Sequence, residues 1–155
     1  MLKRAFTILG VTVALAGVGQ AAEALTWSSK ANPLTVYSGG YARGQAYGNF
    51  YNDNGQFARN ASHYRDALPG GHGVYVETAY YWYKNTTCGS SWCTGFVHTK
   101  IEQTLRTTDQ DWIDGYSIQD LDAEATSARA KIKVCEDRSW APDACSSSVT
   151  RTFDY

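Results

Sequence analysis

The sequence has little of what helical cores are built from. Methionine occurs once, at the first position, and only five leucines follow residue 24. Helical cores depend on Leu, Ala and Met, whereas Tyr, Trp, Val and Thr suit the pleated surface of a sheet. All five Trp, all eleven Tyr and four of the five Phe follow residue 24, so the composition favours a mainly β protein.

An excess of basic residues is also absent. The chain has 155 residues, with 14 Lys and Arg against 15 Asp and Glu and a formal net charge of −1. Nucleic-acid binders depend on basic side chains that neutralise phosphates, so no nucleic-acid partner is expected. A chain of this length forms one domain, which excludes a two-domain enzyme with a separate cofactor module.

The first 24 residues have the three parts of a secretory signal. Met1–Arg4 is cationic, Ala5–Val18 is uncharged and mostly apolar, and Ala22–Ala24 has the small-x-small form of a cleavage site. The apolar run is shorter than the roughly 20 residues that a membrane crossing needs, which makes an uncleaved anchor the weaker alternative. We expect removal of residues 1–24 and a secreted, extracellular protein that begins at Leu25, with no membrane partner.

Four cysteines, Cys88, Cys93, Cys135 and Cys145, lie in the mature part. An even number in a secreted chain predicts two disulfides, for which three pairings exist. We favour Cys88–Cys93 and Cys135–Cys145, because each pair closes a short loop of turn residues. A zinc site is the alternative, but the spacings lack close C-x-x-C pairs, so neither a metal nor a cofactor is expected.

Alternating residue patterns predict about seven strands. The clearest strand is Val74–Tyr83, which returns through Phe96–Leu105 as an antiparallel hairpin. In Tyr41–Tyr51, bulky residues occupy one face and Ala and Gly occupy most of the other, so something packs closely on the small face. Asn52–Gly55 is a strong turn signal. We therefore predict an antiparallel sandwich or small barrel over residues 34–155. The remaining predicted strands are Val36–Tyr37, Gln56–Asp66, a strand from about Ala128 to Cys135, and Val149–Tyr155.

The segment between the signal and the first strand is polar and contains one Trp and one Pro. We interpret it as a flexible, extended N-terminal arm rather than a packed element. Extended segments of this kind bind partners by strand addition or by filling a groove. The arm consists of Leu25, Thr26, Trp27, Ser28, Ser29, Lys30, Ala31, Asn32 and Pro33.

The aromatic cluster Tyr80–Tyr83 places rings on both faces of one strand. One face must belong to the core. The other face, with Tyr75, Tyr81 and Tyr83, suits a surface that binds a protein or a sugar ring if it is exposed. Cover by a neighbouring loop is the equal alternative.

Candidate reactive groups are few. The acidic stretch Asp109–Gly115 resembles a calcium loop in composition, but its spacing departs from the EF-hand pattern and a solvated loop is preferred. Nothing in the spacing joins the three histidines, His63, His72 and His98, into a catalytic or zinc site.

Two carboxylates on neighbouring predicted strands form the remaining candidate. Glu77 and Glu102 suit a pair for glycoside cleavage, but an ion pair between Glu77 and Lys100 across the hairpin is preferred. No serine lies in a G-x-S-x-G elbow, which gives a serine hydrolase little support.

The segment Lys133–Cys145, the strand Val74–Tyr83 and the signal resemble those of small secreted actinobacterial proteins. Among these, the chain is similar to the adaptor subunits of the umbrella toxin particles of Streptomyces-like bacteria. The resemblance implies a non-catalytic linker that joins lectin-type subunits to the repeat-rich stalk of a large toxin protein used against competing bacteria. It also implies that the arm, here Leu25–Pro33, docks in a cleft of the lectin partner.

The sequence thus predicts a secreted, non-catalytic adaptor that binds other secreted proteins through the arm and the tyrosine face. A secreted hydrolase or an enzyme inhibitor is one alternative, and a small carbohydrate-binding module is another.

Overall fold

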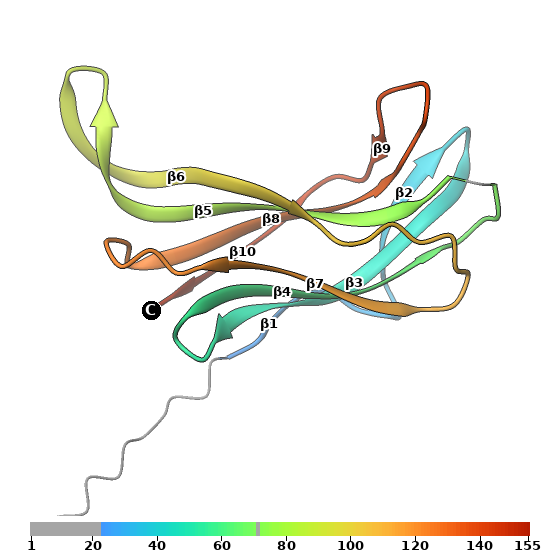
Figure 1. Cartoon of the computed structure of the whole chain (residues 1–155), viewed down its shortest axis with the longest axis horizontal. Helices are drawn as coiled ribbons and strands as arrows, with labels where there is room; N and C mark the ends of the chain where they lie inside the picture. The colour runs from blue at the N-terminus through green and yellow to red at the C-terminus, as the bar shows by residue number, and fades with distance from the viewer. Residues whose placement is uncertain (1–22, 71) are drawn as a thin grey trace, which may run out of the picture.

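The computed structural model describes residues 23–70 and 72–155, and the signal predicted for residues 1–24 lies almost wholly outside them. The described residues form ten β-strands in two antiparallel sheets that pack as a sandwich, with no helix among them (Figure 1). In this part of the chain, therefore, no helix exists that is long and apolar enough to cross a membrane. The predicted mainly β fold and both predicted disulfides are confirmed.

The first sheet is built around a long hairpin. β3 (Tyr41–Asp53) turns through Asn54 and Gly55, whose φ values of 57° and 70° are those of a tight hairpin turn, into β4 (Phe57–Asp66). β1 and β2 both pair with the edge of β3 that faces away from β4. β7 pairs with the edge of β4 that faces away from β3. The bounds of these three strands are Leu25–Ser28 for β1, Leu34–Ser38 for β2 and Ile113–Asp120 for β7.

The second sheet has the order β10-β8-β5-β6, with the short β9 pairing with the end of β8. The long strands β5 and β6 form a hairpin whose tip extends well beyond the body of the sandwich (Figure 1). The bounds are Val74–Cys88 for β5, Ser91–Gln103 for β6, Ser127–Glu136 for β8, Ala144–Cys145 for β9 and Val149–Asp154 for β10.

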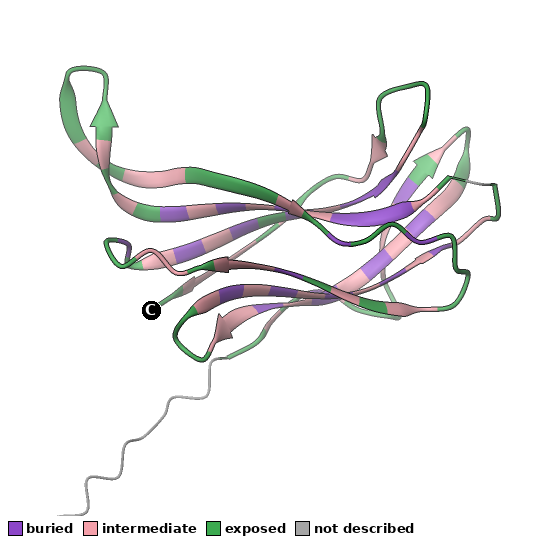
Figure 2. Cartoon of the chain, viewed as in Figure 1, coloured by how far each residue is buried: buried purple, intermediate pink, exposed green. Residues whose placement is uncertain are grey.

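The core lies between the sheets, where buried and partly exposed residues alternate along β4, β5 and β8 (Figure 2). The small face of β3 belongs to this core, as the sequence predicts. A Cβ at Gly44 would lie 2.7 Å from Cγ1 of Val74, so the opposite sheet packs directly on the glycine backbone. Phe50, on the same face, is fully buried and lies 6.2 Å from the ring of Tyr80. The bare face therefore sets how closely the two sheets approach.

A chain of hydrogen bonds crosses the interior. Nε1 of Trp27 donates to Oδ1 of Asn60 over 2.8 Å, and Nδ2 of Asn60 donates to Oγ1 of Thr78 over 2.8 Å. The hydroxyl of Ser117 lies 3.1 Å from Oγ1 of Thr78 and 2.9 Å from the hydroxyl of Tyr80. Because these buried polar groups satisfy one another, the network joins the two sheets without leaving its members unpaired.

The prediction of a free N-terminal arm is wrong. Leu25–Ser28 pairs with β3 as strand β1, and the side chain of Trp27 is only 3% exposed. After β1, Ser29 and Asn32 bridge a tight turn that leads into β2. Burial of the large Trp27 indole stabilises this arrangement. The hydrophobic free energy that it contributes exceeds the conformational entropy that the polar segment loses when it pairs with the sheet.

The predicted count of about seven strands falls short, because β1, β7 and β9 are additional among the described residues. β7 begins within Asp109–Gly115, the acidic stretch for which a solvated loop is the preferred interpretation. Its acidic residues Asp114 and Asp120 are exposed, while Ser117 faces the core. An edge strand tolerates such charges because its outward side chains remain in water.

The strand predicted over Phe96–Leu105 contains a bulge that a continuous alternation of its two faces does not indicate. Tyr81 pairs with His98, but Tyr80 pairs with Lys100, so Thr99 is an extra residue in β6. A bulge of this kind exchanges the two faces of a strand on either side of it. As a result Ile101 lies on the outer face with His98, whereas a continuous alternation would separate them.

The sandwich is closed on one side and open on the other. On the closed side, Nε of Arg151 donates to the carbonyl oxygen of Thr26 over 2.9 Å, and the rings of Phe50 and Phe153 lie 4.9 Å apart. These contacts join β10 to β1 and β3. On the open side the outermost strands are β6 and β7, neither of which pairs with a further strand in the described part of the chain.

Candidate binding face

The outer face of the second sheet carries an aromatic cluster that faces away from the core. Tyr81 and Tyr83 of β5 stand opposite His98 and Phe96 of β6 in the strand register. The rings of Tyr81 and His98 meet edge to face at 5.1 Å, and those of Tyr83 and Phe96 lie 5.0 Å apart. Two of the three tyrosines predicted for a binding face are thus brought together here, with two ring partners from the neighbouring strand.

Two cations from β8 cover these rings. The guanidinium of Arg129 lies 3.5 Å from the ring centroid of Phe96, and Nζ of Lys131 lies 5.2 Å from that of Tyr81. Cation–π contacts of this kind hold long side chains in place over an aromatic surface. Nε of Arg129 also donates to Oγ1 of Thr152 over 3.1 Å, which fixes the guanidinium further.

The face has an excess of positive charge. Lys133 is neutralised by Glu77, since their charged atoms lie 2.9 Å apart. Neither Arg129 nor Lys131 forms an ion pair with any described residue. Ile101 is half exposed on the same face. We call the set of Tyr81, Tyr83, Phe96, His98, Arg129 and Lys131 the aromatic–basic face.

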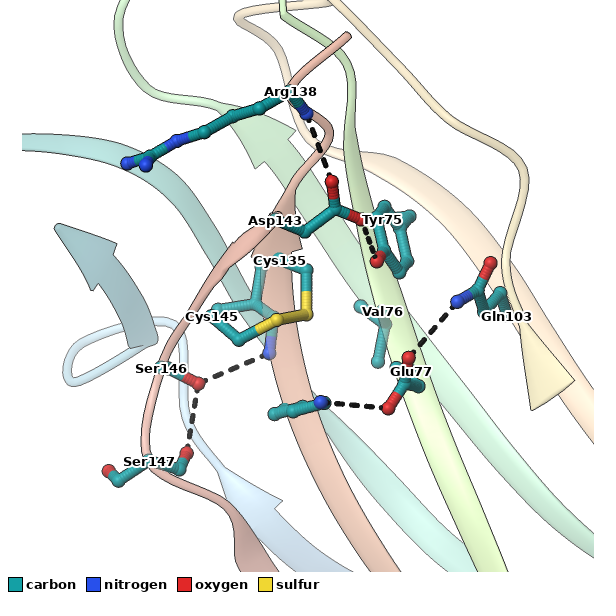
Figure 3. Close-up of a disulfide and its surroundings, with 12 residues drawn as sticks. Tyr75, Val76, Glu77, Gln103, Cys135, Arg138, Asp143, Cys145, Ser146 and Ser147 are labelled. Atoms are coloured by element: carbon teal, nitrogen blue, oxygen red, sulfur yellow. Dashed lines mark hydrogen bonds and ion pairs between the residues drawn. A yellow bond between two sulfur atoms is a disulfide. The ribbon is translucent and has the colours of Figure 1, made fainter. Parts of the chain in front are cut away.

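Tyr75 does not belong to this face, and of the two alternatives left open by the sequence, cover by a neighbouring loop is the one that holds for this residue. The side chain is 2% exposed, and its hydroxyl donates to Oδ2 of Asp143 over 2.5 Å (Figure 3). Asp143 belongs to the loop closed by the Cys135–Cys145 disulfide, and the backbone N–H of Arg138 donates to its other oxygen. Burial, and then the hydrogen bond to Asp143, raises the pKa of Tyr75. The loop therefore covers this tyrosine.

A second aromatic group lies on the outer face of the first sheet. Tyr47 stacks on His63 at 4.6 Å and meets Trp112 edge to face at 4.9 Å. The guanidinium of Arg65 lies 4.7 Å from the Trp112 ring, and Nδ1 of His63 lies 2.5 Å from a carboxylate oxygen of Asp114. The sequence predicted bulky residues on this side of β3, but it did not indicate that β4 and the segment before β7 complete the cluster. We call Tyr47, His63, Arg65 and Trp112 the Trp112 cluster.

The arm residues do not form a mobile binding segment. The indole of Trp27 points inward, Oγ1 of Thr26 donates to Oδ1 of Asn49 over 2.7 Å, and Oγ of Ser28 donates to the carbonyl of Asn32 over 2.6 Å. Lys30 and Ala31 are exposed in the turn between β1 and β2. Docking of a free arm in a partner's cleft has no support in this geometry.

The proposed carboxylate pair is not assembled. Glu77 stands opposite Gln103, and Glu102 stands opposite Thr78, so the two carboxylates lie on opposite faces of the sheet. The predicted ion pair between Glu77 and Lys100 is wrong as well, because Glu77 pairs with Lys133 and Lys100 pairs with Glu102.

The structure places the three histidines on different elements. His63 is on β4, His98 is on β6, and His72 is exposed in the loop before β5. Among the described residues, no group of three or more His, Cys, Asp or Glu side chains is arranged to hold a metal ion. Asp109–Asp114 accordingly shows no converging carboxylates.

A buried carboxylate holds the disulfide loop to the sandwich. Glu136 is 3% exposed and lies between two arginines, with Nε of Arg138 at 3.2 Å and Nε of Arg43 at 3.6 Å. The pKa of the neighbouring Asp66 is raised by burial, while its hydrogen bond from the backbone of Leu68 opposes the shift. This arrangement ties the loop to β3, which makes it a structural clasp.

The chain matches no protein-family model and no curated protein. The two local disulfides in a small β protein are consistent with an extracellular location. The class that fold and site define is therefore a disulfide-braced β-sandwich with aromatic groups on both outer faces.

Proposed function

We propose that this chain is a secreted, non-catalytic binding protein whose aromatic–basic face docks on an acidic surface of another secreted protein. The observation that carries the proposal is the pair of cations, Arg129 and Lys131, that lie over aromatic rings without an acidic partner among the described residues. Aromatic residues and Arg are enriched at the centres of protein interfaces, where they supply most of the binding energy. Acidic side chains of a partner would form ion pairs with Arg129 and Lys131.

The resemblance to toxin adaptors supplies a more specific form of the proposal. An adaptor must hold two partners at once and therefore needs two separate surfaces. The aromatic–basic face lies on the outer side of one sheet and the Trp112 cluster lies on the outer side of the other. We propose that the protein bridges a lectin-type subunit and the stalk of a large secreted toxin by using these two faces, with the N-terminal segment serving as part of the scaffold.

The partner is identified by affinity capture of the tagged protein from the culture supernatant of the source organism, followed by mass spectrometry. Binding of the purified partner is then compared between the wild type and Lys131→Glu. We expect Lys131→Glu to weaken binding by about tenfold or more, since reversing a charge at a complementary interface costs at least about 1.4 kcal/mol. The matched control is Lys30→Glu, which reverses an exposed lysine in the turn after β1 and should leave affinity unchanged.

Tyrosine variants separate the two faces. Tyr81→Ala should weaken binding, whereas Tyr41→Ala, at a 63% exposed tyrosine on the other sheet, should not. Equal binding by wild type, Lys131→Glu and Tyr81→Ala would contradict the proposed face. The bridging role requires a ternary complex, in which Trp112→Ala removes one partner and Lys131→Glu removes the other. Capture of glycans alone, with loss of binding in Tyr81→Ala, would point to a carbohydrate-binding module.

A further inference from the structure

β6 is an edge strand whose first part, Ser91 to His98, is unprotected. Residues 85–99 contain no Asp, Glu, Lys, Arg or Pro. The charged residues of the strand, Lys100 and Glu102, and its bulge at Thr99 all lie further along. Natural proteins block free strand edges with charges, prolines and bulges, because an open edge recruits another strand. The first part of β6 therefore remains available for pairing.

The same part of β6 is accessible from outside. It belongs to the hairpin tip that extends beyond the body of the sandwich (Figure 1), and none of its residues is buried (Figure 2). The indole of Trp92 is 80% exposed. Within residues 23–70 and 72–155, β5 is the only strand that pairs with β6. A further strand can thus approach the outer edge of β6.

The hairpin turn determines which backbone groups of β6 face this edge. Only two residues lie between Cys88 and Ser91, which pair with each other. A two-residue turn makes its closing pair a hydrogen-bonded one, and hydrogen-bonded and non-hydrogen-bonded pairs then alternate along the hairpin. In every second residue of β6 the N–H and C=O groups accordingly point away from β5. Before the bulge these residues are Trp92, Thr94, Phe96 and His98.

We propose that β6 pairs with β6 of a second copy of this chain, antiparallel and across a two-fold axis at Gly95. This is the antiparallel register that uses all four outward-facing residues of both copies. It places Trp92 opposite the second copy's His98, and Thr94 opposite the second copy's Phe96. Aromatic pairs across neighbouring strands stabilise a sheet, so the exposed indole gains a partner. The two second sheets become one continuous sheet, and the two aromatic–basic faces lie on the same side of it.

Gly95 fits a position on the two-fold axis. A residue on such an axis faces its own copy, so a bulky or charged side chain there meets an identical one. Nothing lies within 4 Å of a Cβ built on Gly95, so packing within one chain does not require glycine at this position. Across the axis, glycine lets the two backbones approach with no side chain between them.

Charge favours a second copy at β6 over one at β7, the outermost strand of the other sheet. Two copies of β6 bring no charged Lys, Arg, Asp or Glu together over the paired part. β7 has exposed carboxylates near both of its ends, at Asp114 and Asp120. An antiparallel second copy of β7 would bring these carboxylates towards one another, and like charges across strands destabilise a sheet.

Sedimentation velocity of the purified protein over about 1–300 µM measures the association. We expect a reversible dimer with a Kd on the order of 10 µM, since one paired strand edge is a small interface. Gly95→Lys should raise the Kd by at least about tenfold, because it places two ammonium groups against each other at the axis. Within one chain, the space around Gly95 accommodates the new side chain. Thr87→Lys is the matched control, because it adds the same charge to an exposed residue of β5, away from the paired edge, and should dimerise like the wild type.

Gly95→Cys tests the register itself. Residues that face each other in a non-hydrogen-bonded pair have Cα atoms about 4.5 Å apart, which a disulfide can span. Oxidation in a glutathione buffer should join the two introduced thiols and give a covalent dimer. Mass spectrometry of non-reduced proteolytic fragments identifies this bond and the two native disulfides. Thr87→Cys, at a position away from the axis, should remain mostly monomeric.

A wild-type protein that stays monomeric at about 300 µM would overturn the proposal. So would a dimer that folded Gly95→Lys leaves intact, or equal cross-linking of Gly95→Cys and Thr87→Cys. A monomer that loses capture of a secreted partner in Gly95→Lys would show that the edge takes a strand of a different protein, which also overturns the second copy. Sedimentation uses the purified protein alone, so this proposal and the proposed docking face fail independently of each other.

Discussion

The indole of Trp27 and the side-chain amide of Asn60 meet in the interior over 2.8 Å, between the first strand of the described chain and the central hairpin. The amide of Asn60 continues to Thr78 in the opposite sheet, so β1 is linked to both layers through one residue. A Cβ at Gly48 would lie 3.0 Å from Cζ2 of Trp27, so the indole fills the space that a bare glycine leaves on β3. The segment Leu25–Ser28 is thus a structural part of the sandwich.

Trp27→Ala should therefore destabilise the protein strongly. Loss of a buried Trp side chain costs about 3–5 kcal/mol, because transfer free energy is lost and a cavity remains. Trp27→Phe should cost less, about 1–3 kcal/mol, since the ring is largely kept while Oδ1 of Asn60 loses its donor. Urea denaturation measures both values.

Trp140→Ala is the matched control for these two variants. Trp140 is 99% exposed in the disulfide loop, so its removal should change the free energy of unfolding by less than about 0.5 kcal/mol. A Trp27→Ala protein as stable as Trp140→Ala would show that the N-terminal segment is detached from the sandwich in solution.

Gly115→Ala tests the contact between β7 and β4. The added Cβ would lie 2.7 Å from Cε1 of Tyr64, a buried ring whose hydroxyl is held by Leu105. Because burial and the hydrogen bond to Leu105 hold the ring in place, it cannot move aside without strain. We therefore expect a loss of about 1–3 kcal/mol in the free energy of unfolding. Gly95→Ala is the control, since nothing lies within 4 Å of a Cβ at that position. Equal stability of the two variants would contradict the packing of Tyr64.

The hydrogen bond between Tyr75 and Asp143 predicts a contribution to acid sensitivity. The hydroxyl of Tyr75 first, and the backbone N–H of Arg138 second, lower the pKa of Asp143 below its usual 3.8. Because the folded pKa is the lower one, ionised Asp143 stabilises the folded state above pH 3.8, and this contribution is lost as the pH falls through the folded pKa.

Urea denaturation at a series of pH values checks this contribution. Asp143→Asn should lower stability at neutral pH and reduce the further loss of stability below pH 3.8. Asp111→Asn, at an exposed carboxylate before β7, should retain the wild-type pH dependence. If Asp143→Asn loses as much stability below pH 3.8 as the wild type does, the Asp143 carboxylate does not contribute to the acid sensitivity.

The two disulfides should differ in their reaction with a mild reductant. Cys88 is exposed near the tip of the β5–β6 hairpin, whereas Cys135 is fully buried beneath the loop that ends at Cys145. Alkylation followed by mass spectrometry should therefore detect Cys88 and Cys93 first. Replacing Cys135 and Cys145 by Ala should cost about 2–3 kcal/mol by loop entropy alone. Simultaneous labelling of all four cysteines would contradict this order.

Local patterns in the sequence were sufficient to predict the central strands. Alternation marks β3 and β5, and the pair Asn54-Gly55 marks the turn between β3 and β4, because each signal depends only on neighbouring residues. The disulfide pairing is equally local, since each bridge closes one short loop. These features were predictable without knowledge of the sheet order.

The remaining features depend on contacts between distant residues. β1 forms because Trp27 finds Asn60 and a bare Gly48, neither of which its own segment indicates. The extra residue Thr99 is recognised only from the register in which β6 pairs with β5. The bulge that it forms determines which side chains of β6 lie on the same face as Tyr81. Tyr75 is covered by a loop 68 residues away in sequence, which no pattern within its own strand could show.

The contacts of β10 with β1 and β3 have a consequence for how the domain can be attached to other chains. Leu25 pairs with Phe50, and Phe50 contacts Phe153, so the described chain enters and leaves the sandwich at neighbouring points. Domains whose ends meet in this way tolerate insertion into a host loop and rearrangement of their chain order. This sandwich is therefore suited to insertion into a loop of another protein at a single junction, with the outer faces of both sheets left exposed.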